Sequence, residues 1–253
     1  DCYKNKYSIH QVGAFFRTIR TNYFYNIGIE IEPQQTTNQS YMRDTTLEYS
    51  SRNAINYAPT MNFKYTFSKQ TTLRINYRGR TTQPSMTDLY SKNDISDPLN
   101  IRLTNPNLKP SFNNNISATF NTYFTETLRS FNANFSYSNT INSTTRIVTY
   151  DENTGGRTTQ PTNVNGNWRI NGSFTFSTPL SNKKFTVNTY TNANYGNSVG
   201  FTVLNKESDA VKSNTTNLFL SERLKGNYRS DLIDCELSAG IRYQKSEHSI
   251  KKD

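Results

Sequence analysis

An alternation of apolar and polar side chains with a period of two residues runs through most of this chain and restricts its fold more than any other feature. The stretch YAPTMNFKYTF, residues 57–67, is a clear instance. One parity carries Tyr57, Pro59, Met61, Phe63, Tyr65 and Phe67, and the other carries Ala58, Thr60, Asn62, Lys64 and Thr66. A period of two is that of a β-strand, whose successive side chains point to opposite faces, whereas a helix repeats every 3.6 residues. The segment is therefore predicted as a strand with one apolar face.

The same alternation recurs along the chain and predicts about ten strands. They are expected at residues 7–18, 21–32, 54–68, 71–82, 111–124, 127–139, 166–178, 183–196, 213–226 and 230–246. Short connections near residues 19, 69, 126, 180 and 229 alternate with long ones through 33–53, 83–110, 140–165 and 197–212. These strands are longer than the usual 5–6 residues or so. Long strands joined by connections of alternating length need an architecture that explains both features.

A transmembrane β-barrel explains both, because its strands need about 9–11 residues and its short periplasmic turns alternate with longer extracellular loops. The composition agrees, since only 33% of the residues are hydrophobic while 13% are aromatic, as expected for a sheet with a single apolar face. A soluble β-sandwich also alternates, but with shorter strands and no rhythm of loop lengths. We therefore predict an all-β, antiparallel transmembrane barrel whose apolar side chains face lipid and whose polar side chains face the lumen.

The polar face of the strands predicted at 54–68 and 71–82 carries three cations that are candidates to face the lumen, namely Lys64, Arg74 and Arg78. They are expected to be solvated or paired inside the barrel, and contact with an anionic ligand is the alternative. The formal net charge of the whole chain is +10. The charges are scattered and no nucleic-acid-binding module is recognisable, so no nucleic-acid partner is predicted.

Catalytic and metal-binding signals are absent from the sequence. The two cysteines, Cys2 and Cys235, and the two histidines, His10 and His248, lie near opposite ends of the chain. No cluster has metal-ligand spacing, and no GxSxG, P-loop, GxGxxG or HExxH motif occurs. We predict no enzyme activity, no catalytic residue, no metal and no cofactor.

A family resemblance lies in the long connection that follows the strand at 71–82. The stretches Gln83–Tyr90 (QPSMTDLY) and Thr104–Ser111 (TNPNLKPS) resemble paired signatures of TonB-dependent outer-membrane receptors. Asp97–Ile101 (DPLNI) between them, and Tyr25–Glu32 (YNIGIEIE) earlier, resemble the barrel family of Bacteroidota-type receptors. The chain departs from the family pattern at Ser111, where glutamate is usual, and at Glu30, where a basic residue is usual.

The resemblance implies a barrel of about 22 strands, plugged by a separate domain, that imports a scarce ligand with energy from TonB. Residues 1–253 are then expected to form part of the barrel domain, without plug, signal peptide or C-terminal strand. The implied location is the outer membrane of a Gram-negative bacterium. The implied partners are membrane lipid, TonB acting through the plug, the imported ligand and a surface lipoprotein.

The connection through residues 83–110, called the motif loop below, supplies the remaining candidate site residues: Pro84, Ser85, Leu89, Tyr90, Asn105, Pro106, Leu108, Lys109 and Pro110. Proline fixes φ and asparagine caps turns, so a purely structural role as a rigid strand entry stands beside direct ligand contact.

Three other functions remain open from the sequence. A soluble or surface-anchored β-sheet adhesin predicts a chain that is monomeric without detergent. A small outer-membrane pore predicts that about ten strands close by themselves. A barrel enzyme predicts loss of a hydrolytic activity when His10 or His248 is replaced.

Overall fold

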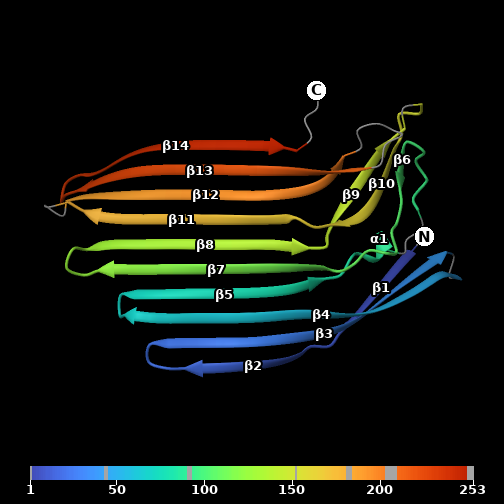
Figure 1. Ribbon diagram of the computed structural model, residues 1–253, viewed down its shortest axis with the longest axis horizontal. Helices are drawn as coiled ribbons and strands as arrows, with labels where there is room; N and C mark the ends of the chain where they lie inside the picture. The colour runs from blue at the N-terminus through green and yellow to red at the C-terminus, as the bar shows by residue number, and fades with distance from the viewer. Residues whose placement is uncertain are drawn as a thin grey trace.

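The computed structural model describes residues 2–42, 45–89, 93–151, 153–180, 184–202 and 210–249. It consists of one 11-stranded antiparallel sheet and a second, three-stranded sheet (Figure 1). The strands of the large sheet are β1 (Cys2–Ile9), β2 (Val12–Ile19), β3 (Tyr23–Met42), β4 (Thr45–Ser68), β5 (Thr71–Thr82), β7 (Ser111–Phe124), β8 (Arg129–Ile141), β11 (Asn167–Pro179), β12 (Phe185–Thr202), β13 (Val211–Arg229) and β14 (Asp234–His248). A search of the described residues for a helix long and apolar enough to span a membrane finds none.

Neighbouring strands of the large sheet follow chain order, from β1 and β2 beside β3 to β14 at the other edge. β1 and β2 pair with β3 in one continuous register, in which Ile9 lies opposite Gln34 and Val12 opposite Ile31. The interruption lies opposite Pro33, whose nitrogen carries no hydrogen to donate. Together the two strands form one line of the sheet, so the described chain has the ten strand lines that the sequence predicts. Among the described strands the sheet does not close, because neither β14 nor the β1–β2 line pairs with the other.

The predicted long connection through 33–53 is wrong. β3 and β4 continue to pair as far as Met42 opposite Thr45, with one irregularity at Ser40–Tyr41. The apolar alternation stops at about Pro33 because this part of the hairpin is polar on both faces, with side chains such as Thr36 and Gln35. Backbone pairing and the β-propensity of threonine sustain the strands without an apolar face.

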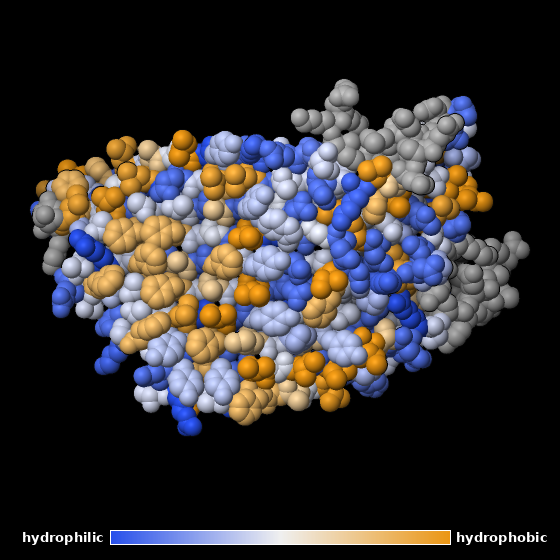
Figure 2. All heavy atoms as spheres, in the orientation of Figure 1, coloured by the Kyte–Doolittle hydropathy of each residue, from blue (hydrophilic) through white to orange (hydrophobic). Residues whose placement is uncertain are grey.

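One face of the sheet is apolar over its whole width, and cross-strand register aligns its side chains. Phe63 on β4 lies between Tyr25 on β3 and Ile75 on β5. Figure 2 shows apolar and aromatic side chains gathered over this face, with hydrophilic side chains collecting toward the end that carries β9 and β10. No described element covers these side chains, and the exposed fraction is 49% for Ile27 and 47% for Phe135. So large an apolar surface indicates a non-aqueous environment.

Aromatic rings from β4, β7, β8 and β11 form an edge-to-face series on this face, and the first contact reaches across β5. Ring centroids lie 6.5 Å apart for Phe67 and Phe120, 5.8 Å for Phe120 and Phe131, and 4.8 Å for Phe131 and Phe174. Such pairs contribute about 0.5–1.5 kcal/mol each beyond the burial of their area. Contacts between these rings therefore stabilise the association of the strands on a face that no second layer of described protein covers.

The opposite face is polar and rich in asparagine, as predicted for a lumen. Asn62 lies between Asn26 and Asn76 in the register. Side-chain hydrogen bonds join the strands here: Thr119 Oγ1 donates to Asn134 Oδ1 at 3.0 Å, and Asn171 Nδ2 donates to Ser136 Oγ at 3.0 Å. Cross-strand polar pairs of this kind stabilise a sheet while leaving the face compatible with water.

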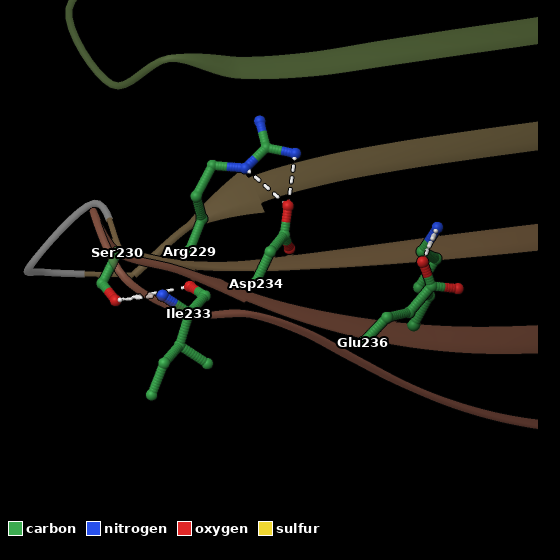
Figure 3. A network of polar contacts seen from close by, with 6 residues as sticks. Arg229, Ser230, Ile233, Asp234 and Glu236 are labelled. Atoms are coloured by element: carbon green, nitrogen blue, oxygen red, sulfur yellow. Dashed lines mark hydrogen bonds and ion pairs between the residues drawn. The ribbon is translucent and has the colours of Figure 1, made fainter.

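The short connections lie at one end of the sheet and the long ones at the other (Figure 1). The turn between β13 and β14 shows how the short end is fixed (Figure 3). Ser230 Oγ accepts a hydrogen bond from the Ile233 backbone nitrogen at 3.2 Å, and an Arg229 guanidinium nitrogen lies 2.9 Å from Asp234 Oδ2. Both charges are mostly exposed, so the pair contributes little to stability, and the turn geometry comes mainly from the backbone.

Candidate functional site

The motif loop is an ordered structure at the end of the sheet that holds the long connections. It begins with α1 (Met86–Leu89), for which Ser85 is the N-cap. The Asp88 backbone nitrogen donates to Ser85 Oγ at 3.1 Å, and Ser85 Oγ donates in turn to Asp88 Oδ2 at 2.7 Å. This reciprocal contact satisfies a free amide at the start of the helix, as a capping residue does. Ser85 therefore has a defined structural role.

A small core of three side chains holds the two halves of the motif together. Met86, Leu89 and Leu108 are 6%, 1% and 4% exposed and contact one another. Asn105 connects this core to the rest of the loop, because its backbone nitrogen donates to the Asp88 carbonyl at 2.7 Å and its side chain donates to the Pro161 carbonyl at 3.0 Å. The packing and hydrogen bonds of these motif residues hold the loop in its folded form.

The other motif residues lie around this core. Pro84 and Pro110 are half-buried, and Pro106 and Lys109 are exposed. The Lys109 backbone nitrogen donates to Asn163 Oδ1 at 2.8 Å, so the strand entry is tied to the neighbouring connection. Tyr90 lies outside the described residues. Whether any of these residues contacts a ligand stays a prediction.

The connections through 83–110 and 140–165 form one structure, which the sequence did not predict. β6 (Asn100–Arg102) pairs in parallel with β10 (Arg157–Val164), and β10 pairs antiparallel with β9 (Ser143–Tyr150). The turn between β9 and β10 packs against the motif loop at Gly156, where an added Cβ would lie 3.1 Å from the Pro98 carbonyl oxygen. Alternation alone does not reveal this sheet, because β6 has only three residues and its partner β10 lies far away in the sequence.

A cavity of ≈ 470 Å³ lies between α1 and this small sheet. Its lining is dominated by charge: the residues are Thr87, Asp88, Asp94, Arg102, Leu103, Thr104, Arg146, Val148, Arg157, Thr159 and Pro161. The volume falls within the range of about 300–1,000 Å³ typical of small-molecule sites. Three guanidinium groups and two carboxylates therefore converge on one pocket at the end of the sheet where the long connections lie.

Two aspartates near the pocket are held in the ionised form. Hydrogen bonds from the Ser96 hydroxyl and backbone nitrogen lower the pKa of Asp94, and the charge of Arg102 lowers that pKa further. Hydrogen bonds from the Asn100 side chain and from the Leu99 backbone lower the pKa of Asp97. A lowered pKa means that these contacts support the folded loop at neutral pH and are lost only as the pH falls below the ordinary aspartate range.

The candidate lumen residues Lys64, Arg74 and Arg78 lie on the polar face of β4 and β5, and their contact with a ligand stays a prediction. Lys64 is the register partner of Arg74, and Arg78 lies opposite Thr60. Arg78 lines a second cavity, of ≈ 630 Å³, together with Arg80, which the sequence analysis did not single out. None of these four cations forms an ion pair or a side-chain hydrogen bond with a described residue. They form a basic strip on the lumen face.

The presence of glycine at position 28, in the YNIGIEIE stretch, is explained by close packing of an aromatic ring. The Phe15 ring on β2 lies across Gly28 on β3, and a Cβ built on Gly28 would meet Phe15 Cδ1 at 2.1 Å. Any side chain here would displace the ring from the polar face. The neighbouring carboxylates Glu30 and Glu32 accept hydrogen bonds from Gln11 Nε2 at 2.9 and 3.3 Å.

The described residues contain no group of three or more histidine, cysteine and acidic side chains that could hold a metal ion. His10 lies in the interruption between β1 and β2, and His248 is the last residue of β14. The strand order places them on opposite edges of the large sheet.

The family of the chain follows from comparison with known proteins. Over most of its length the chain is similar to two solved structures: a siderophore receptor, PirA, from Pseudomonas aeruginosa (11% identity, TM-score 0.44) and an outer membrane transporter, YddB, from Escherichia coli (10% identity, TM-score 0.36). In each case 96% of this chain is covered, but only 57% and 34% of the other chain, so the sequence spans less than two thirds of either structure. No curated protein sequence matches. The outer membrane protein beta-barrel family matches residues 7–250. The chain therefore belongs to that family, and its place is the outer membrane of Gram-negative bacteria.

Proposed function

We propose that this chain is part of the barrel of a TonB-dependent outer-membrane receptor that binds and imports a scarce ligand. The observation that carries the proposal is the ordered motif loop, in which Ser85, Leu89 and Asn105 build a platform at the end of the sheet that holds the long connections. Barrel proteins concentrate function in such loops, because the scaffold beneath them is rigid. The barrel transports and does not catalyse.

The polar face supports the same proposal. A lumen lined with asparagine and threonine suits either water or a plug domain. The basic strip of Lys64, Arg74, Arg78 and Arg80 offers cations that form no ion pair with a described residue, with Glu30 and Glu32 on the lining of the same cavity as Arg78 and Arg80. In this proposal TonB acts through a plug domain that occupies the lumen. The Bacteroidota-type motifs add a surface lipoprotein as a further partner at the outer end.

Import can be tested before the ligand is known. We expect a strain that lacks the full-length gene to leave certain compounds in its growth medium that the wild type depletes, and a strain without TonB to leave the same compounds. Comparative mass spectrometry of spent media measures this directly. The physical reason is that a plug closes the lumen of a barrel of this class, and in this proposal TonB supplies the energy that opens it.

The control is the deletion strain that carries the gene on a plasmid, which should again deplete those compounds. Depletion that depends on the gene but not on TonB would contradict the proposal and indicate an open pore. Depletion unaffected by either deletion would also contradict it and favour a surface adhesin.

A further inference from the structure

We infer that the cavity between α1 and the sheet of β6, β10 and β9 binds a small hydroxylated carboxylate, through the guanidinium groups of Arg102, Arg146 and Arg157. This inference rests on the proposed function and names the chemistry of the ligand. It begins with how the small sheet gathers its arginines. Arg102 is the register partner of Thr159, Arg157 that of Asn100, and Arg146 that of Pro161.

Because register partners share a face and residues two apart along a strand do too, all three arginines stand on one face of the sheet. α1 faces the same cavity with Thr87 and Asp88. Like charges brought together in this way raise the energy of the empty site, and an anion placed among them lowers it. The arrangement therefore favours a negatively charged occupant.

The guanidinium groups remain available for a ligand. Arg102 and Arg146 form no ion pair or side-chain hydrogen bond with any described residue. Arg157 uses only its Nε, which donates to Asn100 Oδ1 at 2.8 Å. Its two terminal nitrogens keep their donors, and these are the groups that grip a carboxylate in the bidentate manner.

Asn100 orients Arg157 for this purpose. Its Nδ2 donates to Asp97 Oδ2 at 2.6 Å, so its oxygen is turned toward the arginine. Asp97 is fixed in turn by the Leu99 backbone nitrogen, which donates to its other oxygen at 2.9 Å. A series from Asp97 through Asn100 to Arg157 thus sets the guanidinium plane before any ligand arrives, and pre-orientation reduces the entropy lost on binding.

The rest of the lining specifies the other groups of the ligand. Asp97 acts on Arg157 from outside the lining, and Asp88 and Asp94 offset part of the remaining positive charge within the pocket. The same two carboxylates accept hydrogen bonds, and Thr104 and Thr159 add hydroxyl groups. Apolar lining is limited to Leu103, Val148 and Pro161. A polar ligand with a carboxylate and several hydroxyl groups matches these partners.

The test uses the full-length receptor in detergent, with citrate as the hydroxylated carboxylate, glycerol as a neutral polyol and inorganic sulfate as an oxyanion without hydroxyl groups. Isothermal titration should show citrate binding that Arg146→Ala and Arg157→Ala each weaken about tenfold or more. Arg157→Lys should weaken it less, because the charge stays while the planar fork is lost. Asn100→Ala should weaken citrate binding while leaving the circular dichroism spectrum and protease resistance of the loop unchanged.

Arg129→Ala is the matched control, because Arg129 begins β8 at the opposite end of the sheet and is exposed. Citrate affinity that is the same in all these variants would overturn the inference, as would glycerol or sulfate binding as tightly as citrate. If medium depletion depends on the gene and on TonB while citrate binding ignores the arginine variants, the pocket assignment fails and the proposed function stands. If citrate binding follows the arginines while depletion needs neither, the pocket stands and import fails.

Discussion

Phe63→Arg should destabilise the full-length protein in lipid by about 2–4 kcal/mol, the cost of an arginine facing lipid near the midplane of an outer-membrane barrel. Phe63 lies on the apolar face between Tyr25 and Ile75. The substitution places a charge where neighbouring side chains offer only rings and an aliphatic chain. Unfolding from lipid vesicles in increasing urea or guanidinium measures the difference in free energy.

Asn62→Arg is the matched control, one residue away on the same strand and on the other face. Asn62 lies between Asn26 and Asn76, so an arginine there points into a polar lumen and should change the free energy of unfolding by less than about 1 kcal/mol. Equal costs for the two variants would contradict the assignment of faces on β4.

Leu89→Ala should open the motif loop. Leu89 is 1% exposed and packs against Met86 and Leu108, and removing such a side chain costs about 2–5 kcal/mol through lost burial and the cavity left behind. A cluster of three side chains has little stability to spare, so this cost should expose the segment between β5 and β7 locally while the barrel stays folded. Limited proteolysis of the full-length protein in detergent, with mass spectrometry of the cleavage sites, measures the opening.

Leu99→Ala controls for the loss of a leucine from the same loop, because Leu99 is 52% exposed. It should leave the cleavage pattern unchanged. Rapid cleavage of both variants, or of neither, would show that the three-residue cluster does not hold the loop together.

The fold was largely predictable because a barrel wall is a local pattern repeated. The alternation of apolar and polar residues around Phe63 and Asn62 is enough to predict which face each occupies. Lipid on one side of the sheet keeps that alternation strict. The ten strand lines were therefore found, with several boundaries correct to within a few residues. The parts of β3 and β4 beyond Pro33 were missed because polar residues such as Gln35 and Thr36 occupy both faces there, so no apolar alternation marks them.

The candidate site was predictable only in part. The sequence singled out the motif that contains Ser85, Leu89 and Asn105, and it left open whether their role is structural. It could not foresee that β6 pairs with β10, because the partners Asn100 and Arg157 are far apart in sequence and neither strand has an apolar pattern. The arginines of the pocket therefore had no signal of their own: Arg146 and Arg157 come from a different connection than Arg102 does.

The central claim is that this sheet is a barrel wall with lipid on one face and a wet lumen on the other. Its most direct test is a nitroxide scan along β8 in the full-length protein reconstituted into lipid, one labelled cysteine at a time in a background where Cys2 and Cys235 are both replaced by serine. We predict that Phe131, Ala133, Phe135 and Tyr137 are accessible to dissolved oxygen, and that Asn132, Asn134 and Ser136 are accessible to a water-soluble nickel chelate. Equal access of the chelate to both sets would contradict the account and favour a sheet that is wet on both faces.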